Sequence, residues 1–214
     1  MTTLQPTETA EALFRVLESG SAELAHQVVA DDFHNPTAIN SPVACQTAGP
    51  RGVLASSAWL RSAFPDLTFS IVSSSATDDQ VWVRLRMRGT HTGPFVRFEN
   101  GEAAQVIPPT GRPIDVEQIH IVSLTAGRVA HHDALRDDLG MLEQLGVFPP
   151  GPSALRMAWW KISGRAARAA RDVSATARDA AEASPRPDAA DARGVVIDRE
   201  RPLSHPTSGS PSEP

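Results

Sequence analysis

The chain has 214 residues, of which 41% are hydrophobic and 21% are charged, and its formal net charge is -5 at pH 7. This acidic balance argues against a general nucleic-acid binder, which would carry an excess of basic residues. The single cysteine, Cys45, excludes an internal disulfide framework and is typical of a reducing compartment. The N-terminus lacks the basic flank and apolar run of a secretory signal, and no segment has the ~18 uninterrupted apolar residues of a membrane span. We therefore expect a cytoplasmic protein with one globular domain and an extension.

The first third of the sequence predicts helices separated by a loop. Apolar residues recur at helical spacing from Thr7 to about Ala30, with an interruption at "ESGSAE". The segment "DDFHNPTAINSP" is typical of a loop because it is rich in Asp, Asn and Pro. A further helix over residues 49–64 would direct Trp59 and Phe64 toward a core and would end before a proline.

From residue 67 the hydrophobic period changes to two, which predicts strands. The alternating segments are 67–72, 81–88 and 114–124, followed by a turn at "TAGR" and a further extended segment, "VAHHDAL". We expect irregular chain over residues 97–113. The segment "RDDLGMLEQLG" predicts a short closing helix that Gly146 caps. Helices followed by a curved antiparallel sheet make an α+β fold.

The alternation of residues 114–124 places two polar side chains, Gln118 and His120, on the apolar face of that strand. The opposite, outer face carries charges that could pair across the sheet: Asp115 and Glu117 with Arg84, Arg86 and Arg88. A buried polar group without a partner costs about 1–3 kcal/mol. Gln118 and His120 therefore need internal partners, water or a ligand, and a satisfied core histidine is the structural alternative to a functional one.

Further ionisable residues gather near the predicted strand ends: His34, His91, His131, His132, Asp133 and Asp137. Such a cluster around an apolar concavity is typical of a small-molecule site. His131 and His132 are adjacent, so in an extended chain only one of them can enter the pocket.

Four segments, taken in order, resemble the SnoaL-like polyketide (ester) cyclase family of the NTF2-like superfamily. They are "AFPDL" (63–67), "GTHTGPF" (89–95), "PPTGRPIDVEQIHI" (108–121) and "RDDLGMLEQLG" (136–146). The resemblance covers about residues 7–149. It implies an NTF2-like conical barrel, in which a curved antiparallel sheet is wrapped by N-terminal helices around a deep apolar pocket.

The resemblance also implies chemistry. Members of the family close a ring of a hydrophobic carbonyl compound by intramolecular aldol condensation, without a metal or an organic cofactor. Motif alignment places the acid/base carboxylate at Asp137 and a histidine partner at His120. A carboxylate can take a proton from a carbon flanked by carbonyls while a neighbouring donor stabilises the enolate. Asp137 also stands where a helix N-cap belongs, so capping is its structural alternative.

The residues that we expect to bind the substrate are His91, Gln118, His34, Trp59, Phe64 and His132. His91 ends a well-patterned strand, and we expect it at the rim of the pocket and less buried than His120. The sequence departs from the family pattern at Asp133, where an aromatic residue is usual, in an apparent insertion over residues 97–106, and in having no tyrosine.

Other functions remain open at this stage. A non-catalytic NTF2-like module could use Gln118 and His120 only to bind a small molecule or a protein. A metal site built from His91, His120, His131 or His132 lacks HxH or HExxH spacing, and we expect no metal or cofactor. Covalent hydrolysis lacks a G-x-S-x-G motif.

The domain division that we expect is residues 1–150 for the barrel, 151–183 for a basic amphipathic helix and 184–214 for a disordered tail. Leu155, Trp159, Ile162 and Ala166 form the apolar seam of the helix. Residues 156–178 hold six basic residues and one acidic residue, a net of +5. We expect the first two turns to dock on the barrel and the rest to project, with at most a weak contact with a membrane surface or an acidic partner.

Two expectations concern assembly and the extension. Trp82, Ile119 and Ile121 on the outer sheet face indicate, by analogy with this fold, a homodimer or higher oligomer. Because the extension is not part of the predicted core, we expect truncation after Pro152 to leave the barrel folded.

Overall fold

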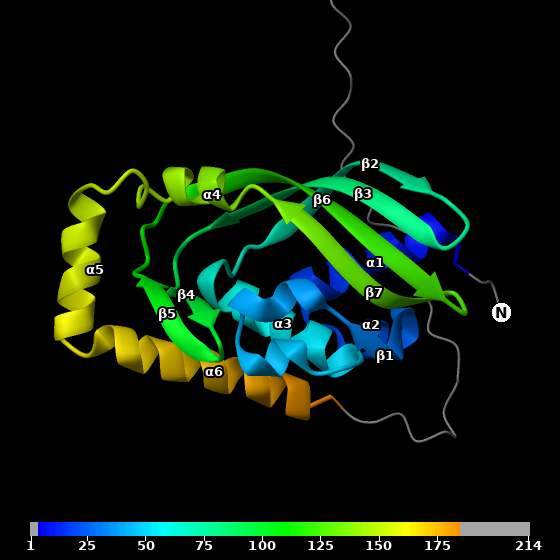
Figure 1. Cartoon of the computed structure of the whole chain (residues 1–214), viewed down its shortest axis with the longest axis horizontal. Coiled ribbons are helices and arrows are strands. Elements are labelled where there is room, and N and C mark those ends of the chain that lie inside the picture. The colour runs from blue at the N-terminus through cyan, green and yellow to red at the C-terminus, as the bar shows by residue number, and fades with distance from the viewer. Residues whose placement is uncertain (1–3, 185–214) are drawn as a thin grey trace, which may run out of the picture.

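A curved five-stranded sheet is the frame on which the helices pack in the computed structural model, which describes residues 4–184 (Figure 1). In sheet order, the strands are β1 (Val29–His34), β7 (Arg128–Arg136), β6 (Pro113–Thr125), β3 (Gln80–Thr90) and β2 (Thr68–Ala76). β1 runs parallel to β7, and all other neighbours are antiparallel. The predicted α+β class is confirmed.

Three helices cover the inner face of the sheet: α1 (Pro6–Ser19), α2 (Ala22–Val28) and α3 (Pro50–Ala63). The predicted interruption of the first helical region is present at Gly20, whose φ of 70° lies in the left-handed region that glycine adopts readily. Two short 3₁₀ helices, η1 (Pro36–Asn40) and η2 (Val43–Gln46), connect β1 to α3.

Strand β3 shows why the sheet has one wet and one dry face. Val81, Val83 and Leu85 are fully buried in the main core, whereas Trp82, one residue out of phase, is 47% exposed. This is the period of two that the sequence predicted. The same alternation along β6 directs Gln118 and His120 inward, since they lie opposite Leu85 and Val83 in the ladder.

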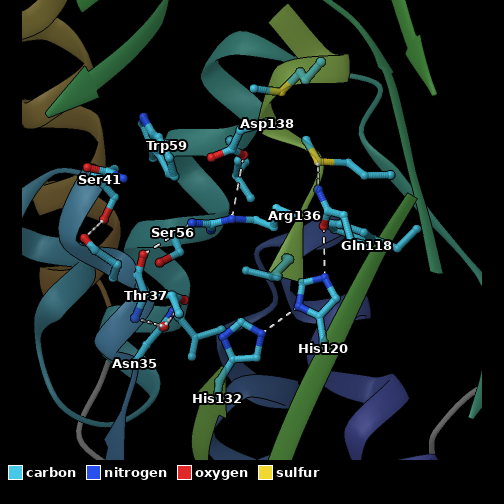
Figure 2. A pocket seen from close by; sticks show the side chains of 18 of the residues that line it. Asn35, Thr37, Ser41, Ser56, Trp59, Gln118, His120, His132, Arg136 and Asp138 are labelled. Carbon is cyan, nitrogen blue, oxygen red and sulfur yellow. Dashed lines mark hydrogen bonds and ion pairs between the residues drawn. The ribbon is translucent and has the colours of Figure 1, made fainter. Parts of the chain in front are cut away.

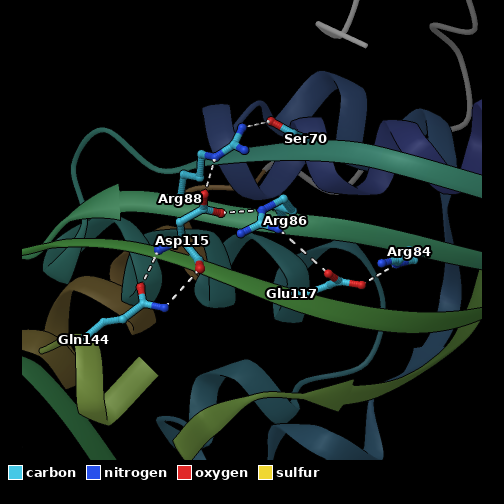
Figure 3. A network of polar contacts seen from close by, with 7 residues as sticks. All are labelled: Ser70, Arg84, Arg86, Arg88, Asp115, Glu117 and Gln144. Atoms are coloured by element: carbon cyan, nitrogen blue, oxygen red, sulfur yellow. Dashed lines mark hydrogen bonds and ion pairs between the residues drawn. The ribbon is translucent and has the colours of Figure 1, made fainter. Parts of the chain in front are cut away.

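The outer face carries the predicted ladder of opposite charges (Figure 3). Arg84 pairs with Glu117, Arg86 lies 2.7 Å from Asp115, and Arg88 lies 3.2 Å from the same carboxylate. Hydrogen bonds from these guanidinium groups hold the pKa values of Asp115 and Glu117 below their usual range. Exposed pairs of this kind contribute little to stability, but together they favour one register of β3 on β6.

Two segments that we expected to be irregular form strands. Part of "DDFHNP" is β1, which pairs with the last strand. Residues 95–107 form a hairpin, β4 (Phe95–Glu99) and β5 (Glu102–Ile107), so the irregular chain expected over residues 97–113 was wrong for its first half. Its turn is Asn100–Gly101, with φ values of 52° and 81°. An Asn-Gly pair is a strong hairpin signal because both positions favour positive φ.

The C-terminal part holds α4 (Asp138–Gln144), α5 (Pro152–Ile162) and α6 (Arg165–Glu182). The single helix predicted for residues 151–183 is thus two helices, which meet at Gly164 with a φ of 74°. The docking expected for the first two turns is only partly present: Met157 of α5 packs against the main core, and Arg156 donates to the backbone oxygens of Pro108 and Pro109. α5 leaves Leu155 77% and Ile162 86% exposed, whereas α6 buries Val173 and its alanine seam against the domain.

Side-chain size explains why α6 docks more closely than α5, because alanines let a helix approach a neighbouring helix closely. Ala177 and Ala181 pack against Ala38, Cys45 and Ala55 in one buried cluster. The Nε of Arg51 donates to the backbone oxygen of Ala181 at 2.8 Å, close to the end of α6. The disordered tail predicted from residue 184 onward lies, except for Ser184, outside the described residues.

Within residues 4–184, no helix is both long enough and apolar enough to cross a membrane. The contact of the basic helix with a membrane surface or an acidic partner, the oligomeric state and the cytoplasmic location stay predictions.

Truncation after Pro152 should uncover Cys45 without unfolding the sheet. The main core draws its buried residues from α1 to α4 and the strands, and α6 contributes none of them. Cys45 is 1% exposed beneath α6, and burial raises the pKa of its thiol to about 11. We expect a thiol reagent such as DTNB to label the truncated chain at least about tenfold faster than the full chain. A retained cooperative thermal transition is the control, and equal labelling rates would contradict the covering role of α6.

Candidate active site

A cavity of about 110 Å³ lies between the inner face of the sheet and the helices (Figure 2). Its apolar wall comes mainly from α1, α3, α4, β2, β3 and β4, and it consists of Leu13, Leu17, Val53, Trp59, Leu60, Phe69, Met87, Phe95, Met141 and Leu142 together with Phe33 and Ala38. Its polar lining consists of Asn35, Thr37, Asn40, Ser41, Ser56, Arg97, Gln118, His120, His132, Arg136 and Asp138. An apolar cavity with a few convergent polar groups is typical of a small-molecule site.

The buried end of the cavity holds a chain of hydrogen bonds between side chains. The Nδ1 of His120 lies 2.8 Å from the Nε2 of His132, and the Nε2 of His120 lies 2.9 Å from the Oε1 of Gln118. The Nε2 of Gln118 donates to the sulfur of Met87 at 3.4 Å. All three polar side chains are less than 8% exposed. The internal partners that the sequence required for Gln118 and His120 are therefore mainly each other and His132.

The chemistry of these partners gives the chain a direction. An amide oxygen only accepts, so the Nε2 of His120 carries the proton that it donates to Gln118. A neutral imidazole then has a bare Nδ1, and His132 must donate to it through its own Nε2–H. The relay thus runs from His132 through His120 to Gln118 with both histidines neutral.

Burial favours the same neutral state. The pKa of His120 is lowered well below its ordinary value, first by burial and then by the electrostatic interaction with His132 and Arg136, which opposes a proton on His120. Burial and the guanidinium of Arg136 lower the pKa of His132 to about 4. At neutral pH the buried end of the cavity therefore carries no charge, and it can donate hydrogen bonds without holding a cation.

Strand geometry explains why these side chains meet. Gln118 and His120 are two residues apart on β6, so they share its inner face. His132 on β7 lies opposite Val122, which makes it the diagonal neighbour of His120. His131 does not line the cavity, as expected for a residue adjacent to His132 in a strand.

The rim of the cavity differs from the expectation at one carboxylate. Asp137 caps α4, with its Oδ1 accepting from the backbone N–H of Gly140 at 2.8 Å, and it is not part of the cavity lining. The carboxylate that lines the cavity belongs to Asp138, which lies 3.9 Å from the Nε of Arg136. Asp138 is therefore a second candidate for the acid/base role that the sequence assigned to Asp137.

Of the expected binding residues, Trp59, Gln118 and His132 line the cavity, and Phe64 and His34 do not. Phe64 is fully buried behind the wall, with its ring 5.9 Å from that of Phe95. His34 is exposed at the end of β1 and does not line the cavity. The lining begins at the next residue, Asn35, and continues into η1.

His91 was expected at the rim and less buried than His120, and this was wrong. His91 is 0% exposed, compared with 4% for His120, and it does not line the cavity. After β3 the chain folds under the end of α3, where Thr92 and Gly93 donate to the backbone oxygen of Ala63. This turn carries the His91 ring into the core, where its Nδ1 accepts from the backbone N–H of Thr110 at 3.3 Å.

Sequence reasoning missed Arg97, Arg136, Asp138 and the polar residues of η1 and its flanks. Arg136 is the last residue of β7. Asp137 and Asp138 follow it directly, and the sequence alone does not indicate which of these two carboxylates faces the cavity. Arg97 lies on the hairpin that was expected to be irregular. Its strand was signalled only by the Asn-Gly turn that follows it.

The histidines considered for a metal site do not gather. Across the described part of the chain, no group of three or more His, Cys, Asp or Glu side chains could hold a metal ion. The rings of His34 and His131 are 6.4 Å apart near the sheet edge, away from the His120–His132 pair.

Residues 7–145 match the model of the SnoaL-like polyketide cyclase family. The chain belongs to this family. Two relatives are aklanonic acid methyl ester cyclases. DauD from Streptomyces sp. strain C5 is 28% identical over 141 residues, which cover 64% of this chain and 80% of DauD. DnrD from Streptomyces peucetius is 30% identical over 128 residues, which cover 58% of this chain and 79% of DnrD. The matched residues end before α5, so both C-terminal helices lie outside the family domain.

Solved structures support the fold. IdmH from Streptomyces antibioticus, a proposed polyketide cyclase, is 29% identical, with a TM-score of 0.52 over 67% of this chain and 100% of that one. TsrD from Streptomyces laurentii is 22% identical, with a TM-score of 0.54 over 66% of this chain and 95% of that one. The NTF2-like architecture that the sequence predicted is thus confirmed.

Stability should fall on mild acidification because of the buried neutral histidines. The pKa values of His91 and His132 are lowered to about 4, chiefly by burial, and that of His120 is also lowered well below its ordinary value by burial. In the unfolded chain these groups titrate near pH ~6.5, so between about pH 6.5 and 4 the unfolded state binds more protons. The free energy of unfolding should therefore decrease as the pH falls through this window, by up to about 1.4 kcal/mol per pH unit for each histidine.

Urea unfolding at pH 7, 6 and 5 measures this dependence. The variant His132→Gln, which keeps a donor but cannot titrate, should show a shallower decrease than the wild type. A free energy of unfolding that stays constant from pH 7 to 5 would contradict the neutral, buried state of the relay.

Proposed function

We propose that this chain is a cofactor-independent cyclase that closes a ring of an aromatic polyketide ester, or a similar hydrophobic carbonyl compound, by an intramolecular aldol reaction. The observation that carries the proposal is the apolar cavity with a neutral hydrogen-bond relay at its buried end and a carboxylate at its rim. Membership of the SnoaL-like family and the likeness to two aklanonic acid methyl ester cyclases support the substrate class.

The rim carboxylate is the base in this proposal. Asp138 takes a proton from a carbon flanked by carbonyl groups, which leaves an enolate. The enolate carbon attacks a second carbonyl of the same molecule, one C–C bond forms, and the resulting alkoxide takes up the proton. Asp137 was the original candidate for this step, but the cavity lining favours Asp138 and leaves Asp137 the cap that orients the start of α4.

His120 supplies the stabilising donor. Its Nε2–H points at the Oε1 of Gln118, and a substrate oxygen that enters the buried end of the cavity can replace this acceptor. A neutral histidine that donates to a developing oxyanion lowers the barrier without a charged resting state. His132 keeps the other nitrogen of the ring occupied, so His120 has one proton and one direction in which to donate it.

The apolar wall contributes by holding the substrate folded. Trp59 and Phe95 stack with ring centroids 5.6 Å apart, and Phe69 and Met87 continue the wall toward the relay. Confining both reacting carbons in one cavity removes much of the entropic barrier to ring closure.

A binding module without turnover is the second candidate. Both ring nitrogens of His120 have partners within the protein, so the relay is complete without a substrate. Such a protein would bind the ester and release it unchanged.

The two candidate carboxylates can be separated by paired substitutions. Asn is as good an N-cap as Asp, so Asp137→Asn should keep α4 and most of the activity. Asp138→Asn removes the cavity carboxylate and should lower kcat by about 10²–10⁴-fold. Turnover of aklanonic acid methyl ester and related aromatic esters, followed by mass spectrometry and absorbance, measures both variants.

The reverse pattern, with Asp137→Asn inactive and Asp138→Asn active, would return the catalytic role to Asp137. Binding of the ester by the wild type without any turnover would favour the binding module. Thermal unfolding of both variants checks that a loss of activity is not a loss of fold.

The relay predicts the tautomer of His120. In the wild type the ring ¹⁵N chemical shifts of His120 should report a proton on Nε2 and a bare Nδ1. His132→Phe leaves that bare nitrogen buried without a donor, which costs about 1–3 kcal/mol, and should move the proton to Nδ1 or admit water. Activity should fall by about tenfold or more, because the donor that faces the substrate is then lost.

The matched control is His132→Gln, whose amide N–H can donate in the place of the imidazole Nε2–H. It should retain the His120 tautomer and most of the activity. An Nδ1–H tautomer of His120 in the wild type would overturn the direction of the relay, whether or not a substrate is known.

A further inference from the structure

Helix α6 runs along the outer side of the segments that form one wall of the cavity (Figure 1). α6 contacts α3, η2, β4 and β5, and it shares a buried cluster with Ala38 of η1. Of these segments, α3, η1 and β4 carry residues that line the cavity. α6 lies outside residues 7–145, which match the family model. The wall is therefore supported by an element that the family domain does not contain.

Strand β4 connects the helix to the cavity through its two faces. Phe95 and Arg97 point inward and line the cavity, whereas Val96 and Phe98, one residue out of phase, pack against α6. Val96 is 0% exposed and Val173 of α6 is 3% exposed in the same apolar cluster. A change in the packing at Val173 can therefore shift β4, whose opposite face lines the cavity.

Trp59 ties this strand to α3. Its indole Nε1 donates to the backbone oxygen of Val96 at 3.0 Å, and its ring stacks on Phe95. The same indole lines the cavity and contacts both apolar clusters to which α6 contributes. A shift of β4 would thus move the largest aromatic side chain of the wall as well as Phe95.

A second contact fixes the other half of the helix. Ala177 is 0% exposed and packs with Ala38, which lines the cavity from η1. Beyond it, Arg51 of α3 donates to the backbone of Ala181, and the Nε2 of His26 lies 2.7 Å from the Oγ of Ser184. Both ends of the supported wall are therefore held at fixed positions along one helix.

We infer that α6 is a structural part of the ligand pocket, and that Val173 is a positioning residue that sets the size of ligand the pocket accepts by holding β4 and Trp59 in place. The inference concerns the same cavity as the proposed function and rests on that proposal only for the class of ligand. Interiors are close-packed, so removing two methyl groups at Val173 leaves space into which Val96 and Phe98 can relax.

The test compares Val173→Ala with Val81→Ala in the full chain. Val81 is 0% exposed in the main core and does not line the cavity, so the control makes the same chemical change at a site equally buried. The first readout needs no ligand: hydrogen exchange of residues 95–99, measured relative to β6. Val173→Ala should accelerate it by about fivefold or more, and Val81→Ala should not.

The second readout is the ratio of the dissociation constants for two probes, methyl 1-hydroxy-2-naphthoate and methyl anthraquinone-2-carboxylate, measured by tryptophan fluorescence. A general loss of stability changes both constants alike, whereas a moved wall changes the ratio. We expect Val173→Ala to shift the ratio by about threefold or more in favour of the larger, three-ring ester, with the Val81→Ala ratio unchanged.

Val173→Ala values that match those of Val81→Ala in both readouts would overturn the inference. If Val173→Ala does not fold, Val173→Cys, which is also smaller than valine and keeps the side chain apolar, takes its place, with smaller changes in the same direction expected in both readouts. If neither probe binds to the wild type, the proposed function loses support, and the exchange of β4 still decides the role of α6.

Discussion

Gln118 and His120 lie on the dry face of β6, and their burial has to be compensated by hydrogen bonds within the protein. Desolvation alone would make each of them unfavourable there. The neighbouring strand β7 supplies the compensation, because its register brings His132 into diagonal contact with His120. The site thus depends on sheet register: a slip of β7 by one residue would turn His132 to the outer face and leave His120 without its donor.

The outer face of the sheet favours a second register, that of β3 on β6, and so positions the strand that carries Gln118 and His120. The ladder of Arg84, Arg86 and Arg88 with Asp115 and Glu117 favours one alignment of β3 on β6. Gln144 of α4 binds the backbone of Asp115 through both ends of its amide, at 2.6 and 3.1 Å, and so fixes the helix that closes the cavity to the same strand. Surface charges that contribute little to stability therefore help to position the buried relay and the rim.

The sequence was informative wherever one period governed a long segment. The alternation along residues 81–88 and 114–124 predicted the inner and outer faces, the charge ladder, and the burial of Gln118 and His120 among apolar residues. It failed where tertiary contacts decide the outcome. Nothing local tells that His91 turns under α3, or which of Asp137 and Asp138 faces the cavity, because adjacent residues differ only in the direction set by the cap of α4.

In the C-terminal extension, too, tertiary contacts decide an outcome that the sequence alone does not predict. By side-chain size, α5 offers more apolar area than α6, so the sequence favoured docking through Leu155 and Trp159. The structure uses alanines instead, since a seam of small side chains can lie close against α3 and η2, whereas the large side chains of α5 stay largely exposed. Closeness of approach, which depends on the partner surface, outweighed hydrophobic area. The consequence reaches the site, because the close approach of α6 is what brings Val173 against the outer side of β4 and so joins a segment outside the family domain to the wall of the cavity.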